Sequence, residues 1–153
     1  MGIFPFFKKK DFFSDKEKEQ IVEAVHMAEK ETSGEVRVYV ESKNPLVDPV
    51  ERAKEIFLQL KMQETEYRNA VLLYIAIEHR ELALFADEGI YQKVGKEFWE
   101  NAVKEMIAHF KGDKISHGIE QCIKKIGQTL KEKLPYDAST NKNELSDDIV
   151  FGK

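Results

Sequence analysis

Three short segments of this 153-residue chain carry side chains that could do chemistry. They are Ser33-Gly34-Glu35, Arg68-Asn69 and Asp87-Glu88-Gly89. Carboxylate oxygens are the ligands that Ca²⁺ and Mg²⁺ prefer, and a guanidinium can hold phosphate through two hydrogen bonds. We therefore expect a site for Ca²⁺ or Mg²⁺ whose ligands are Asp87, Glu88 and Glu35. Arg68 and Asn69 beside it would form either a phosphate clamp or a structural ion pair.

Two interpretations of these residues stay open. A metal-dependent acid phosphatase would use Arg68 to hold the phosphate and the carboxylates to bind the cation. Alternatively, Arg68 pairs with Asp87 or Glu35, Asp87 caps the helix that follows, and Gly89 makes its turn. The chain has no Cys with five residues to an Arg and no Asp-x-Asp pair. Catalysis is therefore the less favoured interpretation.

The apolar patterns around these segments predict a mixed sheet. Residues 35–41 alternate as a half-buried strand does, and residues 70–77 form the unbroken apolar run of a central strand. A helix predicted between them makes the two strands parallel, and a turn at Glu78-His79 makes a third strand, 80–86, antiparallel. The starts of the first two strands and the end of the third then lie at the same end of the sheet, which brings the three segments together.

Helices are predicted before, between and after these strands. Ser14 and Glu17 form a capping box for the first helix, and Asp48 caps the second. One long helix is expected from Ile90, followed by a last helix that stops at Leu134-Pro135. This order of elements predicts an α/β fold with helices covering a small mixed sheet.

Length and composition indicate one domain, expected over residues 14–135 between an N-terminal arm, 1–13, and a flexible polar C-terminal tail, 136–153. The tail ends in Ile149-Val150-Phe151, which has the composition to add a strand to a sheet edge. A net charge of −4 argues against a nucleic-acid partner. The single cysteine, Cys122, excludes a disulfide within the chain.

The N-terminal arm combines aromatic rings with a cluster of lysines. A segment of this kind can lie on a membrane surface, with its rings in the interface and its ammonium groups on anionic lipid. Alternatively, the arm contacts a protein, packs on its own domain or lies in solvent. We expect a cytoplasmic protein, with peripheral contact at the inner face of the membrane as the narrower hypothesis. The residues that would make this contact are Phe4, Phe6, Phe7, Lys8, Lys9 and Lys10.

The order and spacing of the motifs resemble the TPM domain family, in particular its short bacterial type. The resemblance covers nearly the whole chain, although short bacterial members more often have Pro where Ser146 stands. It rests on Thr32-Ser33-Gly34-Glu35-Val36, residues 68–76, Ala86-Asp87-Glu88-Gly89-Ile90, Phe98-Trp99 and residues 143–149.

The resemblance implies a compact αβα sandwich. It also implies association with membrane assemblies, with a LemA-type membrane protein or a longer TPM protein as the partner. A plant member of the thylakoid lumen, linked to photosystem repair, has been described as an acid phosphatase and calcium binder. We therefore expect an accessory or interaction module of membrane-associated assemblies that binds a divalent cation, with a metal-dependent acid phosphatase as the alternative.

Overall fold

The computed structural model describes residues 12–46, 48–110, 115–137, 139 and 145–152. Its strands form one sheet in the order β3-β2-β1-β4. β1 is parallel to β2 and to β4, and β3 is antiparallel to β2. The predicted fold class and strand directions are confirmed. The elements are α1 (Asp15–Lys30), β1 (Glu35–Glu41), α2 (Pro49–Gln59), β2 (Ala70–Ala76), β3 (Glu81–Ala86), α3 (Glu88–Val94), α4 (Lys96–Phe110), α5 (Ile115–Lys133) and β4 (Val150–Phe151).

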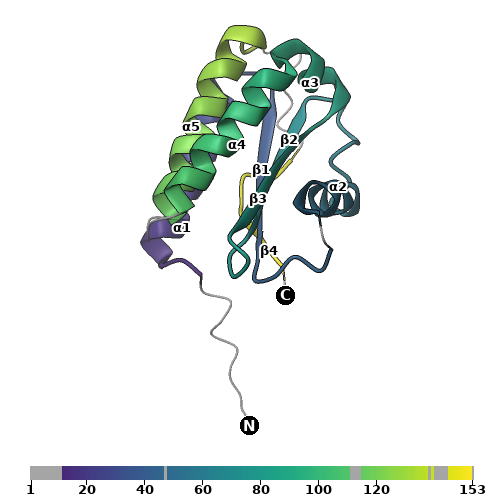
Figure 1. Ribbon diagram of the computed structural model, residues 1–153. Coiled ribbons are helices and arrows are strands. Elements are labelled where there is room, and N and C mark those ends of the chain that lie inside the picture. The colour runs from purple at the N-terminus through teal and green to yellow at the C-terminus, as the bar shows by residue number, and fades with distance from the viewer. Residues whose placement is uncertain (1–11, 47, 111–114, 138, 140–144, 153) are drawn as a thin grey trace.

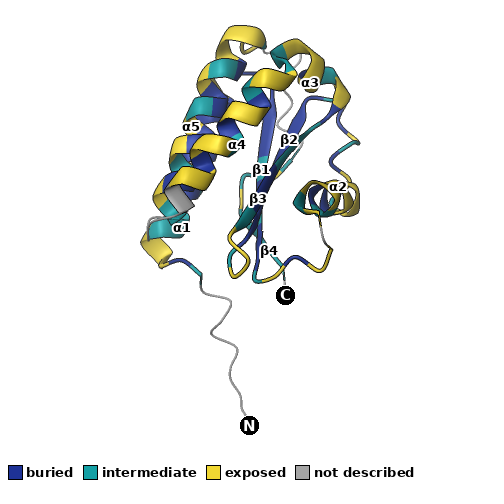
Figure 2. Cartoon of the chain, viewed as in Figure 1, coloured by how far each residue is buried: buried dark blue, intermediate teal, exposed yellow. Residues whose placement is uncertain are grey.

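Helices cover both faces of the sheet (Figure 1). α1, α4 and α5 pack against one face, and α2 packs against the other. In Figure 2 the strands between these layers are mostly dark blue, whereas the outer faces of the helices are yellow. All seven residues of β2 are buried, which is the pattern of a central strand covered on both faces.

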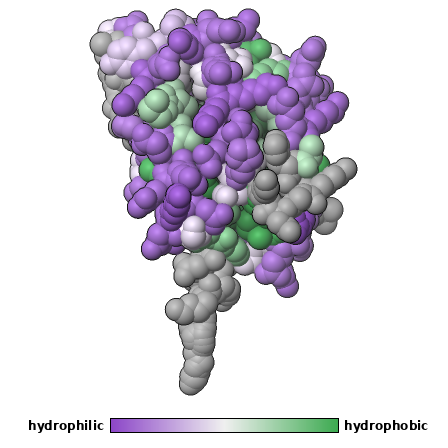
Figure 3. Space-filling view, turned by 90° about the vertical axis from the view of Figure 1, so that its left-hand side faces the viewer, coloured by the Kyte–Doolittle hydropathy of each residue, from purple (hydrophilic) through white to green (hydrophobic). Residues whose placement is uncertain are grey.

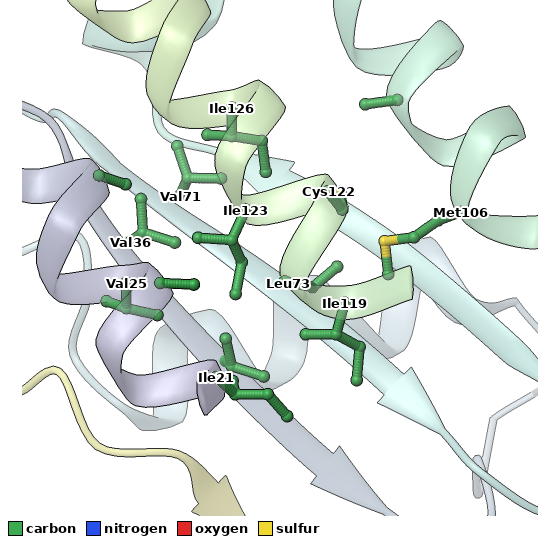
Figure 4. Close-up of a cluster of buried hydrophobic side chains, with 14 of the residues drawn as sticks. Ile21, Val25, Val36, Val71, Leu73, Met106, Ile119, Cys122, Ile123 and Ile126 are labelled. Atoms are coloured by element: carbon green, nitrogen blue, oxygen red, sulfur yellow. The ribbon is translucent and has the colours of Figure 1, made fainter. Parts of the chain in front are cut away.

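Alternation along the strands divides the apolar interior into two clusters. Val36 and Val38 of β1 pack toward the three-helix layer. Tyr39, the next residue along the strand, packs on the α2 side. This follows because successive side chains of a strand point to opposite faces. Figure 4 shows the larger cluster, in which α1, α5 and α4 converge on the sheet with Ile21, Val25, Ile119, Ile123, Met106 and Cys122.

The predicted starts of the first two helices are confirmed. Ser14 Oγ accepts a hydrogen bond from the backbone N–H of Glu17 at 3.1 Å, and Glu17 Oε1 accepts one from the N–H of Ser14 at 2.8 Å. Asp48 Oδ1 accepts from the N–H of Val50 at 2.9 Å. These side chains satisfy N–H groups that have no partner within the helix.

The long helix predicted from Ile90 is wrong, because the segment forms two helices. Gly95 lies between α3 and α4 with φ of 99°, and its N–H donates to the carbonyl of Tyr91 at 2.9 Å. Glycine adopts this backbone conformation without the steric cost that a Cβ would add. The apolar step of four continues across Gly95, which is why the sequence pattern suggested one helix.

The C-terminal segment joins the sheet, as its composition predicted. Val150 and Phe151 pair with Tyr39 and Val40 of β1, and the N–H of Gly152 donates to the carbonyl of Val40 at 2.8 Å. The ring of Phe151 lies 6.4 Å from that of Phe12, centroid to centroid. The arm residues proposed to touch a membrane, Phe4 to Lys10, lie outside the described residues.

Candidate functional site

The three segments meet at one end of the sheet, where β1 and β2 begin and β3 stops, as the strand directions predicted. The N–H of Glu35 donates to the carbonyl of Asn69 at 3.0 Å, and the N–H of Asp87 donates to the carbonyl of Ala70 at 2.9 Å. We call Arg68, Asn69, Asp87, Glu88 and Gly89 the rim. Its geometry follows from the order of three strands and does not depend on any bound group.

An ion pair forms the centre of the rim. Arg68 Nε donates to Asp87 Oδ2 at 2.7 Å, and Arg68 Nη2 donates to Asp87 Oδ1 at 2.8 Å. Asp87 is the N-cap of α3, where its Oδ1 also accepts from the N–H of Glu88 at 2.8 Å. The hydrogen bonds to Asp87 raise the pKa of Arg68 above its ordinary value. A two-pronged pair of this kind fixes the start of α3 against the start of β2.

Close backbone packing completes the rim. A Cβ added at Gly89 would lie 2.4 Å from the carbonyl oxygen of Tyr67, so a larger residue cannot fit without a backbone shift. Asn69 is 3% exposed, and its side-chain amide donates to the carbonyl of Ser33. The rim therefore ties the loops before β1 and β2 to the start of α3.

The carboxylate of Glu35 takes part in a second group of acids. Glu35 is 2% exposed, and its Oε1 accepts from the N–H of Leu145 at 2.6 Å. Its charge also raises the pKa of Glu29 on α1. Asp147, from the C-terminal segment, forms the third member. We call Glu29, Glu35 and Asp147 the acidic cluster.

Glu29 and Asp147 face each other across the junction between α1 and the C-terminal segment. Glu29 is 8% exposed, and its Oε2 accepts from the N–H of Val36 at 2.8 Å. Glu29 Oε1 and Asp147 Oδ1 are both buried, and no N–H or O–H donor of the described residues reaches either oxygen unless one of the two carboxyls carries a proton. Burial, together with hydrogen bonding to the Asp147 carboxyl, raises the pKa of Glu29 to about 9. Glu29 therefore holds a proton at neutral pH.

One histidine also contacts the acidic cluster. His26 Nδ1 lies 3.3 Å from Asp147 Oδ2, one turn of α1 before Glu29. The contact fastens the C-terminal segment to α1 from the solvent side, since the His26 side chain is half exposed.

Sequence reasoning missed Glu29 and did not single out Asp147 as a site residue. A signal existed for Glu29, which follows Ile21 and Val25 at steps of four and therefore lies on the apolar face of α1. An acid on that face requires a buried partner. For Asp147 no local signal was available, because its partner comes from the opposite end of the chain.

A third charged group was also missed, at the far end of β1. Arg52 Nε and Nη2 donate to the two oxygens of Glu41 at 2.8 and 2.9 Å, and Tyr74 Oη donates to Glu41 Oε2 at 2.5 Å. Burial, then hydrogen bonding to Glu41, raises the pKa of Tyr74. These side chains satisfy one another, so the group anchors α2 to the sheet and resembles a structural network.

Cys122 belongs to the core. It is 6% exposed, and burial raises the pKa of its thiol to about 12. A thiol is reactive as the thiolate, so this cysteine is poorly suited to be a nucleophile.

The fold defines the class of protein: a single α/β domain with a four-stranded mixed sheet between helices. The family model described as the TPM domain matches residues 7–129, and the chain belongs to this family. A search of curated proteins gave no match.

Solved structures support this assignment. The BA42 protein of Bizionia argentinensis is 33% identical, with a TM-score of 0.86, covering 94% of this chain and 97% of that one. The N-terminal domain of a P. gingivalis protein is 14% identical (TM-score 0.68; 82% of this chain, 81% of that one). The N-terminal domain of cg2496 from Corynebacterium glutamicum is 12% identical (TM-score 0.59; 78% and 74%). The latter two support the fold alone.

Each helix in the described part of the chain is too short or too polar to span a lipid bilayer. Figure 3 views the molecule from the side of the three-helix layer, where hydrophilic side chains predominate. Apolar side chains gather near the residues drawn in grey.

Proposed function

We propose that this TPM domain is a non-enzymatic accessory module whose C-terminal segment is fastened by the acidic cluster, and that Ca²⁺ or Mg²⁺ binds this cluster in exchange for a proton. The observation that carries the proposal is the pair of buried oxygens, Glu29 Oε1 and Asp147 Oδ1, which no donor of another described residue reaches. Hard divalent cations bind such carboxylate oxygens.

A proton and a cation would serve the same purpose at this cluster. Burial is the main cause of the raised pKa of Glu29, followed by hydrogen bonding to Asp147, and repulsion by the charges of Asp147 and Glu35 adds to both. A divalent cation would neutralise the same charge and release the proton from Glu29. The described residues hold no ready-made group of three or more His, Cys, Asp and Glu metal ligands. The cation would therefore bind by replacing the proton of Glu29.

The rim fits a cation less well. Both oxygens of Asp87 accept hydrogen bonds from Arg68, whose positive charge would also repel a metal ion. Glu88 lies 3.3 Å from the same guanidinium. Ligation by Asp87 and Glu88 stays a prediction that requires the ion pair to open. A phosphatase finds no support in this geometry either, because Arg68 already holds a carboxylate where it would hold phosphate.

Titration of the full chain with CaCl₂ and MgCl₂, followed by amide chemical shifts and thermal unfolding, tests the proposal. We expect shifts at Glu29, Val36 and Leu145, and a melting temperature that rises with cation concentration, because binding to the folded state alone stabilises it. Glu29→Gln should abolish both effects.

Asp87→Asn is the matched control, because it changes one carboxylate of the rim to an amide and leaves the acidic cluster intact. Shifts confined to residues 87–89, lost in this variant and kept in Glu29→Gln, would place the cation at the rim and refute the proposal. No cation-dependent shift in either protein would refute cation binding altogether.

A second part of the proposal concerns the partner, which we expect to be a membrane-associated protein of the LemA type or a longer TPM protein. The family supports this partner. The position of Phe12 supports it too, because Phe12, the first described residue after the Phe- and Lys-rich arm, packs beside Phe151 of β4. Co-sedimentation with anionic liposomes, comparing the full chain with a chain that begins at Ser14, tests the arm. Equal pelleting of the two would refute membrane contact through it.

A further inference from the structure

We infer that the outer edge of β3 and the groove beside it bind an extended apolar peptide segment of a partner protein, which adds a strand to the sheet. This inference is independent of the cation proposed above, since β3 lies at the edge of the sheet opposite β4. It rests on three observations: free backbone groups, an unguarded edge and an apolar groove.

The backbone of β3 offers hydrogen-bonding groups on its outer side. The bond from the N–H of Asp87 to the carbonyl of Ala70 marks a hydrogen-bonded pair, and such pairs alternate along an antiparallel ladder. The N–H and C=O groups of Leu82, Leu84 and Ala86 therefore point away from β2. Within the described ranges no partner for these groups is found.

The sequence of β3 does not guard this edge. Its six residues, Glu81–Ala86, contain one charge at the start and neither Lys nor Pro. Edge strands are commonly protected by charged residues, proline or a bulge, which prevent pairing with other chains. The opposite edge is covered in part by β4, so the fold covers one edge with its own C-terminal segment and leaves the other available (Figure 1).

An apolar groove of about 370 Å³ adjoins the end of β3. It lies between α2 and α3, and its apolar lining is formed by Phe57, Leu58, Phe85 and Tyr91. Leu58 is 49% exposed and Tyr91 is 38% exposed, which is unusual for large apolar side chains that face a common groove.

The polar lining of the groove comprises Lys54, Gln63, Gln92 and three residues of the rim, Arg68, Asp87 and Glu88. The rim charges pair with one another, which leaves Lys54 and Gln63 to contact an occupant. Gln63 Oε1 is buried and has no hydrogen-bond partner among the residues described, and a rotation of this side chain toward the groove would let it accept from a peptide N–H. Lys54 lines the same groove and forms no ion pair with any described residue, which favours an acidic side chain in the segment. An extended peptide satisfies the edge, Gln63 and the groove together, because its backbone pairs while alternate side chains point inward.

Selection from a phage-displayed library of random linear peptides on the full chain tests the inference. We expect enriched sequences with alternating apolar residues and an acidic one, and slowed amide exchange of Leu82, Leu84 and Ala86 when a synthetic enriched peptide binds. Leu58→Glu should weaken that peptide by about ten-fold or more, because a carboxylate would be buried in the apolar groove.

Val50→Glu is the matched control, since Val50 lies on α2 with the same 49% exposure and does not line the groove. It should leave the affinity unchanged. Leu84→Pro removes an outward N–H that takes no part in the sheet, so it should also weaken the peptide; if this variant fails to fold, Leu58→Glu decides. Failure to enrich any peptide, equal binding to Leu58→Glu, or protection mapped to other elements would overturn the inference.

Discussion

The rim and the acidic cluster each contain buried carboxylates, Asp87 in the rim and Glu29 and Glu35 in the cluster, and they differ in how those carboxylates are satisfied. At the rim, Asp87 receives two hydrogen bonds from Arg68 and one from the backbone of α3. In the acidic cluster, Glu29 and Asp147 each keep one buried oxygen without a partner in the described part of the chain. Burial and hydrogen bonding to the Asp147 carboxyl raise the pKa of Glu29.

This difference is why we propose a structural role for the rim and a cation for the acidic cluster. A carboxylate whose hydrogen bonds are complete stabilises the fold and has little left to offer a ligand. A buried carboxylate with an open oxygen requires a proton or a cation. Of the three predicted metal ligands, Asp87 and Glu88 pair with Arg68, and Glu35 belongs to the acidic cluster, whose other two members were not predicted as site residues.

The largest effect is expected where the rim is packed most tightly. Gly89→Ala would place a Cβ against the backbone of Tyr67 and should lower the free energy of unfolding by roughly 3 kcal/mol, measured by urea denaturation. Gly95→Ala, where no atom lies within 4 Å but φ is positive, should cost about 1 kcal/mol. A smaller loss for Gly89→Ala than for Gly95→Ala would contradict the structural role of the rim.

The acidic cluster should make stability depend on pH. Because the pKa of Glu29 is raised from 4.5 to about 9, the folded state binds a proton that the unfolded state releases. Without added cation, the free energy of unfolding should fall as pH rises through this window, by at most about 1.4 kcal/mol per pH unit. Glu29→Gln should flatten the dependence, as urea midpoints at several pH values would show; an unchanged slope would exclude Glu29 as its source.

The contact between the chain ends should contribute a smaller amount. Phe151→Ala removes the ring packed beside Phe12 and under the ammonium of Lys18, and should lower the free energy of unfolding by about 1–2 kcal/mol, since Phe151 is only partly buried. It should also raise the exchange rate of the Gly152 amide, which bonds to β1. Unaltered exchange would show that β4 is held by other contacts.

The smallest effect is expected where the two regions are independent. Asp87→Asn should change the dissociation constant for Ca²⁺ by less than about two-fold, because no hydrogen bond or ion pair among the described residues joins Glu29 or Asp147 to Arg68 or Asp87. Calorimetric titration checks this. A much larger change would show that the rim and the cluster are coupled.

The sequence predicted the rim because its geometry follows from local patterns. Alternation in residues 35–41, the apolar run of β2 and the turn before β3 determine strand direction, and direction alone brings Asp87 to Ala70. The cap at Ser14 was equally local. The break at Gly95 was missed because the apolar pattern on both sides of it fits one helix as well as two.

The acidic cluster could not be derived in the same way. Glu29 and Asp147 lie in α1 and near the C-terminus, and their meeting depends on the path of the C-terminal segment across the sheet. The segment's affinity for a sheet edge was predictable from Ile149-Val150-Phe151, but the register that places Asp147 against Glu29 was not. Glu35 was assigned to the metal site by its position at the rim, whereas its side chain joins the cluster.

The most direct test of the central claim is the titration of the Glu29 side-chain carboxyl carbon by NMR, with and without Ca²⁺. We expect a midpoint near 9 in the absence of cation, because the proton is held between Glu29 and Asp147, and a clearly lower midpoint once Ca²⁺ is added. A midpoint near the ordinary 4.5 under both conditions would show that the cluster holds neither a proton nor a metal ion.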